Sequence, residues 1–254
     1  MTALLASIED DIDPFAEEAM RTQTGVPCPY GLPHVQYLDF FKSDRCGGGE
    51  YEAALVRGWR RSGSIFYRNR CADNCASCVP IRIDVNALAP TKSQRHAICV
   101  NADLNVTVSP ASFEREDYDL FKKYLAARHS ETALSFDEDE YYQAYVRSPV
   151  ETILARYRTA EGKLIAVSYL DSLPDGLSSV YFIFDPDEGK RSLGVFSVFA
   201  ESNLLRAEEK KWYYLGFWIH DCAKMAYKGN FRPFETAKDG IWTRKDTTSP
   251  DITR

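Results

Sequence analysis

The segment between residues 57 and 82 concentrates side chains that could do chemistry. Its first part is strongly basic, with five arginines and no acid between Arg57 and Arg70. Three aromatic residues are interleaved with these arginines: Trp59, Phe66 and Tyr67. Guanidinium groups bind carboxylate and phosphate in bidentate fashion, and aromatic rings stack on nucleobases. The segment therefore predicts a binding surface for an anionic partner, with a solvated basic face of no function as the alternative.

Three cysteines follow directly, at Cys71, Cys75 and Cys78. Thiols at this spacing on a loop are typical of a metal site, and Cys28, in its own proline-rich loop, is the candidate for a fourth ligand. Zinc, a [4Fe–4S] cluster and free thiols that oxidise are all open. The acidic N-terminal segment is unlike a secretory signal, and no apolar run reaches the roughly 20 residues that span a bilayer. We therefore expect a cytoplasmic protein with reduced thiols.

The distribution of charge supports an anionic partner more clearly than the total does. The 254 residues carry a net charge of −6, which by itself disfavours nucleic-acid binding. However, the stretch from Arg57 to Arg95 has eight basic and two acidic residues, a local balance of +6 against −12 for the rest. A basic surface on an acidic body suits an enzyme that binds and releases a polyanion.

The elements that must position these residues follow from periodicity and turn residues. In the first half the pattern predicts a helix at 51–58 and strands at 35–41, 64–68 and 79–85. The second half begins with an amphipathic helix at 116–129 and a possible second helix within 132–149. The further elements expected there are strands at 151–158, 164–172 and 178–184, a helix at 194–206 and a strand at 212–219.

This order of elements predicts an α+β protein. Helix, helix, three strands, helix and strand is the order of a GNAT-like acyltransferase fold, which we expect in the C-terminal half. A smaller N-terminal α/β domain would carry the cysteine loop. The expected divisions are an acidic arm at 1–26, a cysteine- and arginine-rich domain at 27–108, the GNAT-like domain at 109–238 and a tail at 239–254.

Several short motifs, in order from about Cys28 to Glu235, resemble the aminoacyl-tRNA–protein transferases. They are Tyr51 to Gly63, the cysteine run ahead of Pro80-Ile81-Arg82, Ser93-Gln94-Arg95, Tyr124 to His129, Ser192-Leu193-Gly194, Tyr214 to Ile219, Lys224 to Gly229 and Phe231-Arg232-Pro233. The family comprises the arginyltransferases and the bacterial aspartate/glutamate leucyltransferases. The short chain, the Cys28-Pro29-Tyr30 loop and the cysteine run are more similar to the leucyl branch, whereas residues 219–222 resemble the arginyl branch.

The resemblance implies a transferase that moves an amino acid from aminoacyl-tRNA to the N-terminal Asp or Glu of a protein and so marks that protein for degradation. Leucine is the favoured donor amino acid and arginine the alternative. The implied partners are aminoacyl-tRNA and proteins with N-terminal Asp or Glu, with no membrane, and we expect a monomer. An acyl-CoA N-acyltransferase and a non-catalytic RNA-binding module are the other hypotheses, although residues 189–194 have too few glycines for a pyrophosphate loop.

The implied chemistry selects the candidate site residues. The tRNA ester is already activated, so the protein need only position the amine, accept a proton and stabilise the oxyanion. We expect His220 as the general base and Tyr67 and Tyr227 as catalytic hydroxyl groups. The candidates for binding the tRNA end and the acidic acceptor are Arg60, Arg61, Arg128, Tyr181, Lys224 and Lys228. Each of the cations could instead form a surface or structural ion pair.

No cofactor is expected for the chemistry itself. In the arginyltransferases an N-terminal cysteine group and a later pair can hold an iron–sulfur cluster, and the resemblance implies such a site at Cys28, Cys71, Cys75 and Cys78. This chain departs from that pattern, because Gly31 stands where a Cys-x-x-Cys pair would have its second thiol. The cysteine site is therefore a hypothesis for either zinc or a cluster.

Overall fold

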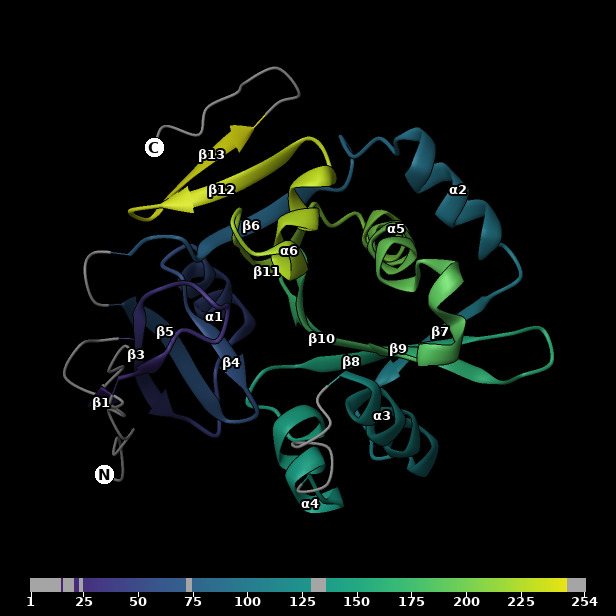
Figure 1. Ribbon diagram of the computed structural model, residues 1–254, viewed down its shortest axis with the longest axis horizontal. Helices are drawn as coiled ribbons and strands as arrows, with labels where there is room; N and C mark the ends of the chain where they lie inside the picture. Colours follow the sequence, from purple (N-terminus) through teal and green to yellow (C-terminus); the bar gives the residue numbers. More distant parts are fainter. Residues whose placement is uncertain (1–14, 16–20, 23–24, 72–74, 129–135, 246–254) are drawn as a thin grey trace, which may run out of the picture.

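The computed structural model describes residues 15, 21–22, 25–71, 75–128 and 136–245. These residues form two β-sheets (Figure 1). The smaller sheet has the strand order β1-β3-β5-β4, with β2 also paired to β3. Its elements are β1 (Arg21–Thr22), β2 (Val26–Pro27), β3 (Val35–Lys42), α1 (Gly48–Leu55), β4 (Arg60–Ser62) and β5 (Ile65–Cys71). Its aromatic core contains Phe41, Trp59 and Phe66, and Phe15 packs edge-on against all three.

The larger sheet has eight strands in the order β13-β12-β6-β11-β10-β9-β8-β7. Its strands are β6 (Val79–Asp84), β7 (Asn105–Pro110), β8 (Thr152–Arg158), β9 (Leu164–Leu173), β10 (Gly176–Phe184), β11 (Trp212–Trp218), β12 (Phe234–Lys238) and β13 (Ile241–Lys245). The central strands β9 and β11 are buried along most of their length, as expected for strands that are covered on both faces.

Helices cover both faces of the larger sheet (Figure 1). In this view α3 and α4 lie below it, and α2 and α5 lie above it. The helical elements are α2 (Lys92–Val100), α3 (Arg115–Arg128), α4 (Glu138–Tyr141), the π-helix η4 (Tyr142–Val146), the 3-10 helix η5 (Pro186–Arg191), α5 (Leu193–Ala207), α6 (Ala223–Ala226) and the 3-10 helix η6 (Tyr227–Asn230). Among the described helices, none has the length and apolar composition of a membrane span. The predicted α+β class and the GNAT-like order of the C-terminal half are confirmed.

Strands β10 and β11 are parallel partners over only a short stretch. Their pairing runs from Gly176 opposite Trp212 to Ser178 opposite Tyr214 and then stops. In β11 the pairing with β6 is also irregular between Tyr214 and Phe217, where Gly216 has a φ of +82°. The two strands therefore part beyond their first residues, which leaves space in the middle of the sheet for a site.

The two sheets divide the chain differently from the predicted domains. Strand β6 and the first residues of β7 fall within the predicted N-terminal domain at 27–108, but both strands belong to the eight-stranded sheet. Strand β6 belongs to the larger sheet because it pairs with both β11 and β12 and because its Ile81 and Ile83 are fully buried there. Strand β13 lies within the predicted tail at 239–254 and pairs with β12. Most of the predicted arm at 1–26 and residues 246–254 lie outside the described residues.

Candidate active site

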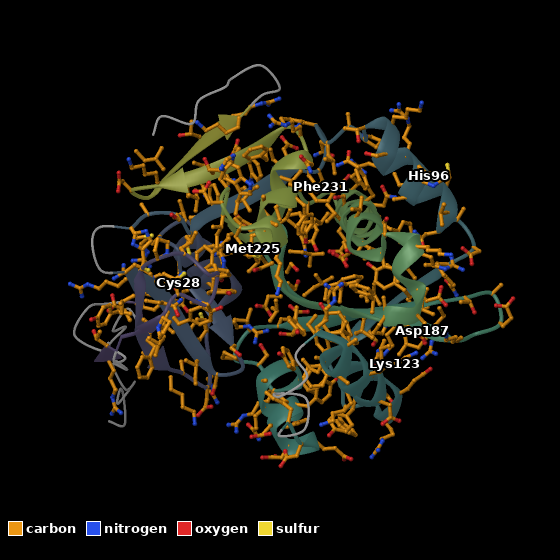
Figure 2. All side chains as sticks on the ribbon, in the orientation of Figure 1. Cys28, His96, Lys123, Asp187, Met225 and Phe231 are labelled. Atoms are coloured by element: carbon orange, nitrogen blue, oxygen red, sulfur yellow. The ribbon has the colours of Figure 1, made fainter. Side chains whose placement is uncertain are left out.

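A cavity of about 850 Å³ opens where β10 and β11 part. Both sheets line it: residues of the small sheet and its loops form one wall, and β10, β11, α5, α6 and η6 form the others. Met225, one of the lining residues, lies near the middle of the view in Figure 2, between the two sheets. Eight of the nine side chains predicted to bind substrate or catalyse line this cavity: Arg60, Arg61, Tyr67, Arg128, Tyr181, Lys224, Tyr227 and Lys228.

Arg60 is buried at the cavity wall without an acidic partner among the described residues. Strand β4 supplies it, and its guanidinium donates hydrogen bonds of 2.7 Å to the carbonyl oxygens of Trp59 and Gly216. The same group lies 4.9 Å from the ring centre of Phe217. Its Nε is buried and has no hydrogen-bond partner. Burial lowers the pKa of Arg60, yet an arginine remains charged at neutral pH.

Lys228 brings a second cation to the same place. It comes from η6, is half-buried, and donates from Nζ to the carbonyl oxygen of Phe217 at 3.0 Å. A Cβ atom at Gly216 would lie 3.7 Å from the Nζ of Lys228 and 3.9 Å from the Nε of Arg60. Burial and the nearby Arg60 charge lower the pKa of Lys228 to about 7. This ammonium group therefore titrates near neutral pH.

Arg61 also reaches the cavity wall, but its guanidinium is turned to Asp171. It makes two hydrogen bonds to that carboxylate, one of them 2.6 Å long from Nε, and a third of 2.9 Å to Thr152 Oγ1. The side chains of Arg61 and Asp171 are both fully buried. A guanidinium that is satisfied in this way has little left for a ligand, so the geometry gives Arg61 a structural role between β4 and β9.

Arg128 and Lys224 lie exposed at the mouth of the cavity. Arg128, at the end of α3, stacks over Tyr124 and Phe184, with its guanidinium carbon 5.8 and 5.4 Å from the ring centres. Exposed cations on aromatic rings are well suited to contact phosphate groups, which need charge but no desolvation.

The three predicted tyrosines lie in the lining with their hydroxyl groups un-ionised. Burial raises the pKa of Tyr67, Tyr181 and Tyr227, and for Tyr67 the charge of Arg60 opposes that rise. Tyr181 also stacks on Tyr145 of the π-helix, at 5.0 Å between ring centres. Neutral phenols can donate hydrogen bonds to a developing oxyanion, and they are poor proton acceptors.

His220 does not line the cavity, so the structure does not support its predicted role as general base. Its side chain is about half exposed and its Nδ1 lies 2.9 Å from a carboxylate oxygen of the neighbouring Asp221. The physical reason is the alternation of side chains along an extended chain. Ile219 is fully buried, so the next residue turns to the surface, where it packs edge-on against Trp218.

Sequence reasoning missed a buried carboxylic acid behind the cavity. Glu201 is fully buried on α5 and accepts hydrogen bonds from Tyr157, at 2.6 Å, and from Ser168 and Tyr213. Tyr213 lines the cavity. Burial is the largest influence on Glu201 and raises its pKa. The signal that could have found it is that Glu201 is the single acid of α5 and lies among mostly apolar residues.

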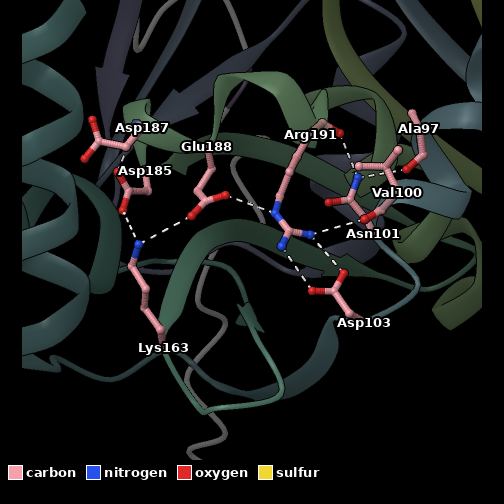
Figure 3. A network of polar contacts seen from close by, with 9 residues as sticks. All are labelled: Ala97, Val100, Asn101, Asp103, Lys163, Asp185, Asp187, Glu188 and Arg191. Atoms are coloured by element: carbon pink, nitrogen blue, oxygen red, sulfur yellow. Dashed lines mark hydrogen bonds and ion pairs between the residues drawn. The ribbon is translucent and has the colours of Figure 1, made fainter.

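A polar network holds the loop that forms the far wall of the cavity (Figure 3). Arg191, at the end of η5, pairs with Asp103 at 2.9 Å and with Glu188 at 3.0 Å. Asn101 donates to the carbonyl oxygen of Arg191 at 2.7 Å, and Lys163 pairs with Asp185 at 3.0 Å. These contacts fix the start of α5, whose residues 193–195 line the cavity. The first N–H groups of a helix lack partners within the helix and favour an anion or a carbonyl oxygen.

The four predicted metal ligands gather on the small-sheet side of the molecule, where Figure 2 labels Cys28. Burial raises the pKa of Cys71 and Cys78, and the other thiols of the group raise it further. The thiols are therefore neighbours. However, the described residues contain no group of three side chains with the geometry of a metal site, so the arrangement does not fit a bound ion as it stands.

Comparison with known proteins gives two family matches. Residues 26–96 match the N terminus, and residues 116–238 the C terminus, of arginine-tRNA-protein transferase. The chain is 37% identical to an aspartate/glutamate leucyltransferase of Nitrosococcus oceani over 220 residues, 85% of this chain and 92% of that protein. It is 36% identical to that of Gluconacetobacter diazotrophicus over 238 residues, 92% of this chain and 90% of the other. Among solved structures, L-PGS from Bacillus licheniformis has a TM-score of 0.47 and 10% identity, covering 82% of this chain and 71% of that chain.

Proposed function

Because the chain belongs to the family of the arginine-tRNA-protein transferases and the aspartate/glutamate leucyltransferases, we propose that it transfers leucine from leucyl-tRNA to proteins with N-terminal Asp or Glu. The cavity between β10 and β11 is the site of transfer. The product, a protein with a new N-terminal leucine, is a substrate for degradation. We further infer a cytoplasmic enzyme that acts as a monomer.

The charge of the cavity lining supports the proposed substrates. Among the described residues that line the cavity, five are cations and none is a carboxylate. An acidic acceptor and the phosphates of a tRNA end are favoured by such a lining. The same lining disfavours arginine as the transferred amino acid, because a guanidinium group would meet like charges and no acid.

The rest of the lining fits the uncharged side chain of leucine. Apolar residues of β10, α5 and β11 contribute to the same cavity: Val180, Phe182, Leu193, Val195, Val198 and Leu215. Burying an aliphatic side chain against them contributes about 1.5–3 kcal/mol of binding free energy. The transferred side chain therefore has an apolar wall, while the acceptor and the nucleotide end have cationic ones.

The reaction needs little more than placement. The α-amine of the acceptor attacks the ester carbonyl carbon of leucyl-tRNA, and the terminal ribose oxygen leaves. Holding the two reactants together supplies much of the rate enhancement. We assign the neutral hydroxyl groups of Tyr67 and Tyr227 to donate to the oxyanion, and Arg128 and Lys224 to bind phosphates at the mouth.

A transfer assay with the purified full chain tests this function. tRNA charged with labelled leucine or labelled arginine is offered with matched peptides that begin with Asp, Glu, Asn or Lys. We expect label from leucyl-tRNA on the Asp and Glu peptides only. Transfer from arginyl-tRNA at an equal or higher rate contradicts the proposed donor, and transfer to the Asn peptide at the rate of the Asp peptide contradicts the proposed acceptor.

A further inference from the structure

Two cations of the cavity, Arg60 and Lys228, converge on one point without a compensating acid among the described residues. Arg60 Nε and Lys228 Nζ both lie within 4 Å of the position that a Cβ atom would take at Gly216. Arg60 is 5% exposed and its Nε makes no hydrogen bond. A buried donor without a partner destabilises the folded state. An arrangement of this kind is expected where a ligand supplies the missing acceptor.

The surrounding backbone holds both cations in place and keeps the point between them open. The carbonyl oxygens of Gly216 and Phe217 accept from Arg60 and Lys228, at 2.7 and 3.0 Å. Gly216 has a φ of +82°, a conformation that residues with a Cβ rarely adopt. Any side chain there would fill the space between the two nitrogens. We call this point, defined by Arg60, Gly216 and Lys228, the cation seat.

The groups around Lys228 decide its protonation state. Arg60 on β4 is the charged neighbour that acts on it, and the strand on which it rests presents the neutral Phe217. The other titratable groups of the lining are the cations Arg61, Arg128 and Lys224 and the tyrosines Tyr30, Tyr51, Tyr67, Tyr124, Tyr181, Tyr213 and Tyr227. No described lining group is an anion, so burial and the Arg60 charge hold the pKa of Lys228 at about 7, and its two protonation states have similar populations at neutral pH.

We propose that the cation seat binds the side-chain carboxylate of the acceptor's N-terminal residue, and that Lys228 then takes the proton of the acceptor's α-ammonium group. This inference rests on the proposed function and assigns its acceptor site. The bound carboxylate stabilises the charged form of Lys228, because an opposite charge within about 4–6 Å favours ionisation. The acidic side chain that is recognised therefore creates the base that activates the amine beside it.

The step balances without any further reactant. An N–H bond of the α-ammonium group breaks and an N–H bond forms at Lys228 Nζ. The freed lone pair forms the new C–N bond with the ester carbonyl carbon while the ester C–O bond breaks. The leaving ribose oxygen takes a second proton from the attacking nitrogen and becomes a hydroxyl group, and Lys228 returns its proton to water when the product leaves.

Calorimetric titration of the full chain, without tRNA, tests the seat. Two peptides of the same sequence are compared at pH 7.5, one beginning with Asp and one with a succinyl group, which has the side-chain carboxylate but no α-amine. Titrations in buffers of different ionisation enthalpy give the number of protons taken up on binding. We expect binding of the succinyl peptide to take up most of one proton from the solvent. Binding of the Asp peptide should take up almost none, because its own ammonium group supplies the proton that Lys228 accepts.

The variant Lys228→Arg keeps the charge but cannot lose it at these pH values. We expect it to bind the succinyl peptide without proton uptake and to transfer leucine at least ~100-fold more slowly at pH 7.5, with the pH profile of the free α-amine. Lys238→Arg, an exposed change on β12, is the matched control and should match the wild type in both measurements.

The outcomes separate the seat from the proposed function. Failure of the wild type to bind either peptide, or binding of the succinyl peptide without proton uptake, overturns the seat. Wild-type transfer with an unchanged pH profile in Lys228→Arg overturns the role of Lys228 as base and leaves leucyl transfer standing. If no charged tRNA donates label while the succinyl peptide still binds with proton uptake, the function falls and the seat remains.

Discussion

Replacing Lys228 by methionine should stabilise the protein at neutral pH, in an amount that depends on pH. In the folded protein the pKa of this ammonium group falls from 10.5 to about 7. At about 1.36 kcal/mol per pKa unit, holding Lys228 inside the cavity costs roughly 4 kcal/mol at pH 7. This figure is an upper bound, because the half-buried side chain still contacts water in the cavity. Methionine has a similar length and no charge to desolvate, so it removes the cost.

The direction of the pH dependence follows from linkage. A lysine whose pKa is lowered by folding contributes its full stability at a pH above its pKa in the unfolded chain. This contribution is lost as the pH falls toward its pKa in the folded protein. The advantage of Lys228→Met over the wild type should therefore be largest near pH 7 and shrink by about 1.4 kcal/mol per pH unit toward pH 10.

Urea unfolding followed by tryptophan fluorescence, for both proteins in parallel from pH 7 to pH 9.5, measures this difference. Other groups titrate alike in both proteins, so the difference between the two free energies of unfolding gives the contribution of Lys228. A difference that does not change with pH, or a methionine variant less stable than the wild type at pH 7, would refute the reasoning. The same variant should have lost leucyl transfer, so that stability and activity change in opposite directions.

Three further predictions concern groups around the cavity. Arg61→Met should lower the free energy of unfolding by about 3–5 kcal/mol, because it leaves Asp171 buried and unpaired, and adding Asp171→Leu should restore most of it; equal urea midpoints for wild type and Arg61→Met would contradict the structural role. Glu201→Gln should be at least as stable as the wild type at pH 7: an acid with a raised pKa contributes its stability below the unfolded value of about 4.3 and loses it as the pH rises through the folded pKa. Between pH 4 and pH 8 the melting temperature of the variant should decline less steeply than that of the wild type, and parallel plots of melting temperature against pH would count against a raised pKa of Glu201. Finally, the pKa of Cys78 is raised to about 12 from 9.0, so its alkylation by iodoacetamide at pH 8 should be ~1,000-fold slower than that of an ordinary thiol; peptide mass spectrometry measures this, with the exposed Cys99 as the internal reference, and equal rates at the two cysteines would disprove it.

Local pattern was sufficient for the elements and for the residue types of the site. The amphipathic helix predicted at 116–129 is α3, and the helix predicted at 194–206 is α5, because apolar periodicity reports the buried face directly. The cations of the cavity were found from the basic segment and from the motifs shared with a known family. These signals identify side chains that can bind an anion.

What the sequence could not provide is which partner each side chain meets. Arg60 and Arg61 are neighbours of the same type, yet Arg61 pairs with Asp171 far along the chain and Arg60 finds only carbonyl oxygens. His220, two residues after the end of β11, lies away from the cavity because of how the chain leaves the sheet, which the sequence does not show. The place of β6 was missed for the same reason, because a short apolar strand fits either sheet until its partners are known.

The position of β6 has a consequence for how the protein is made. The strand is synthesised early, but its two neighbours, β11 and β12, follow only near the end of the chain. Such distant pairings slow folding, because a long loop must close before any contact forms. During synthesis both edges of β6 stay unpaired until β11 and β12 have been made, so the active site cannot form before residue 238 has been added. A fragment cut between residues 96 and 116, where the two family matches leave a gap, should therefore neither fold nor bind peptide by itself.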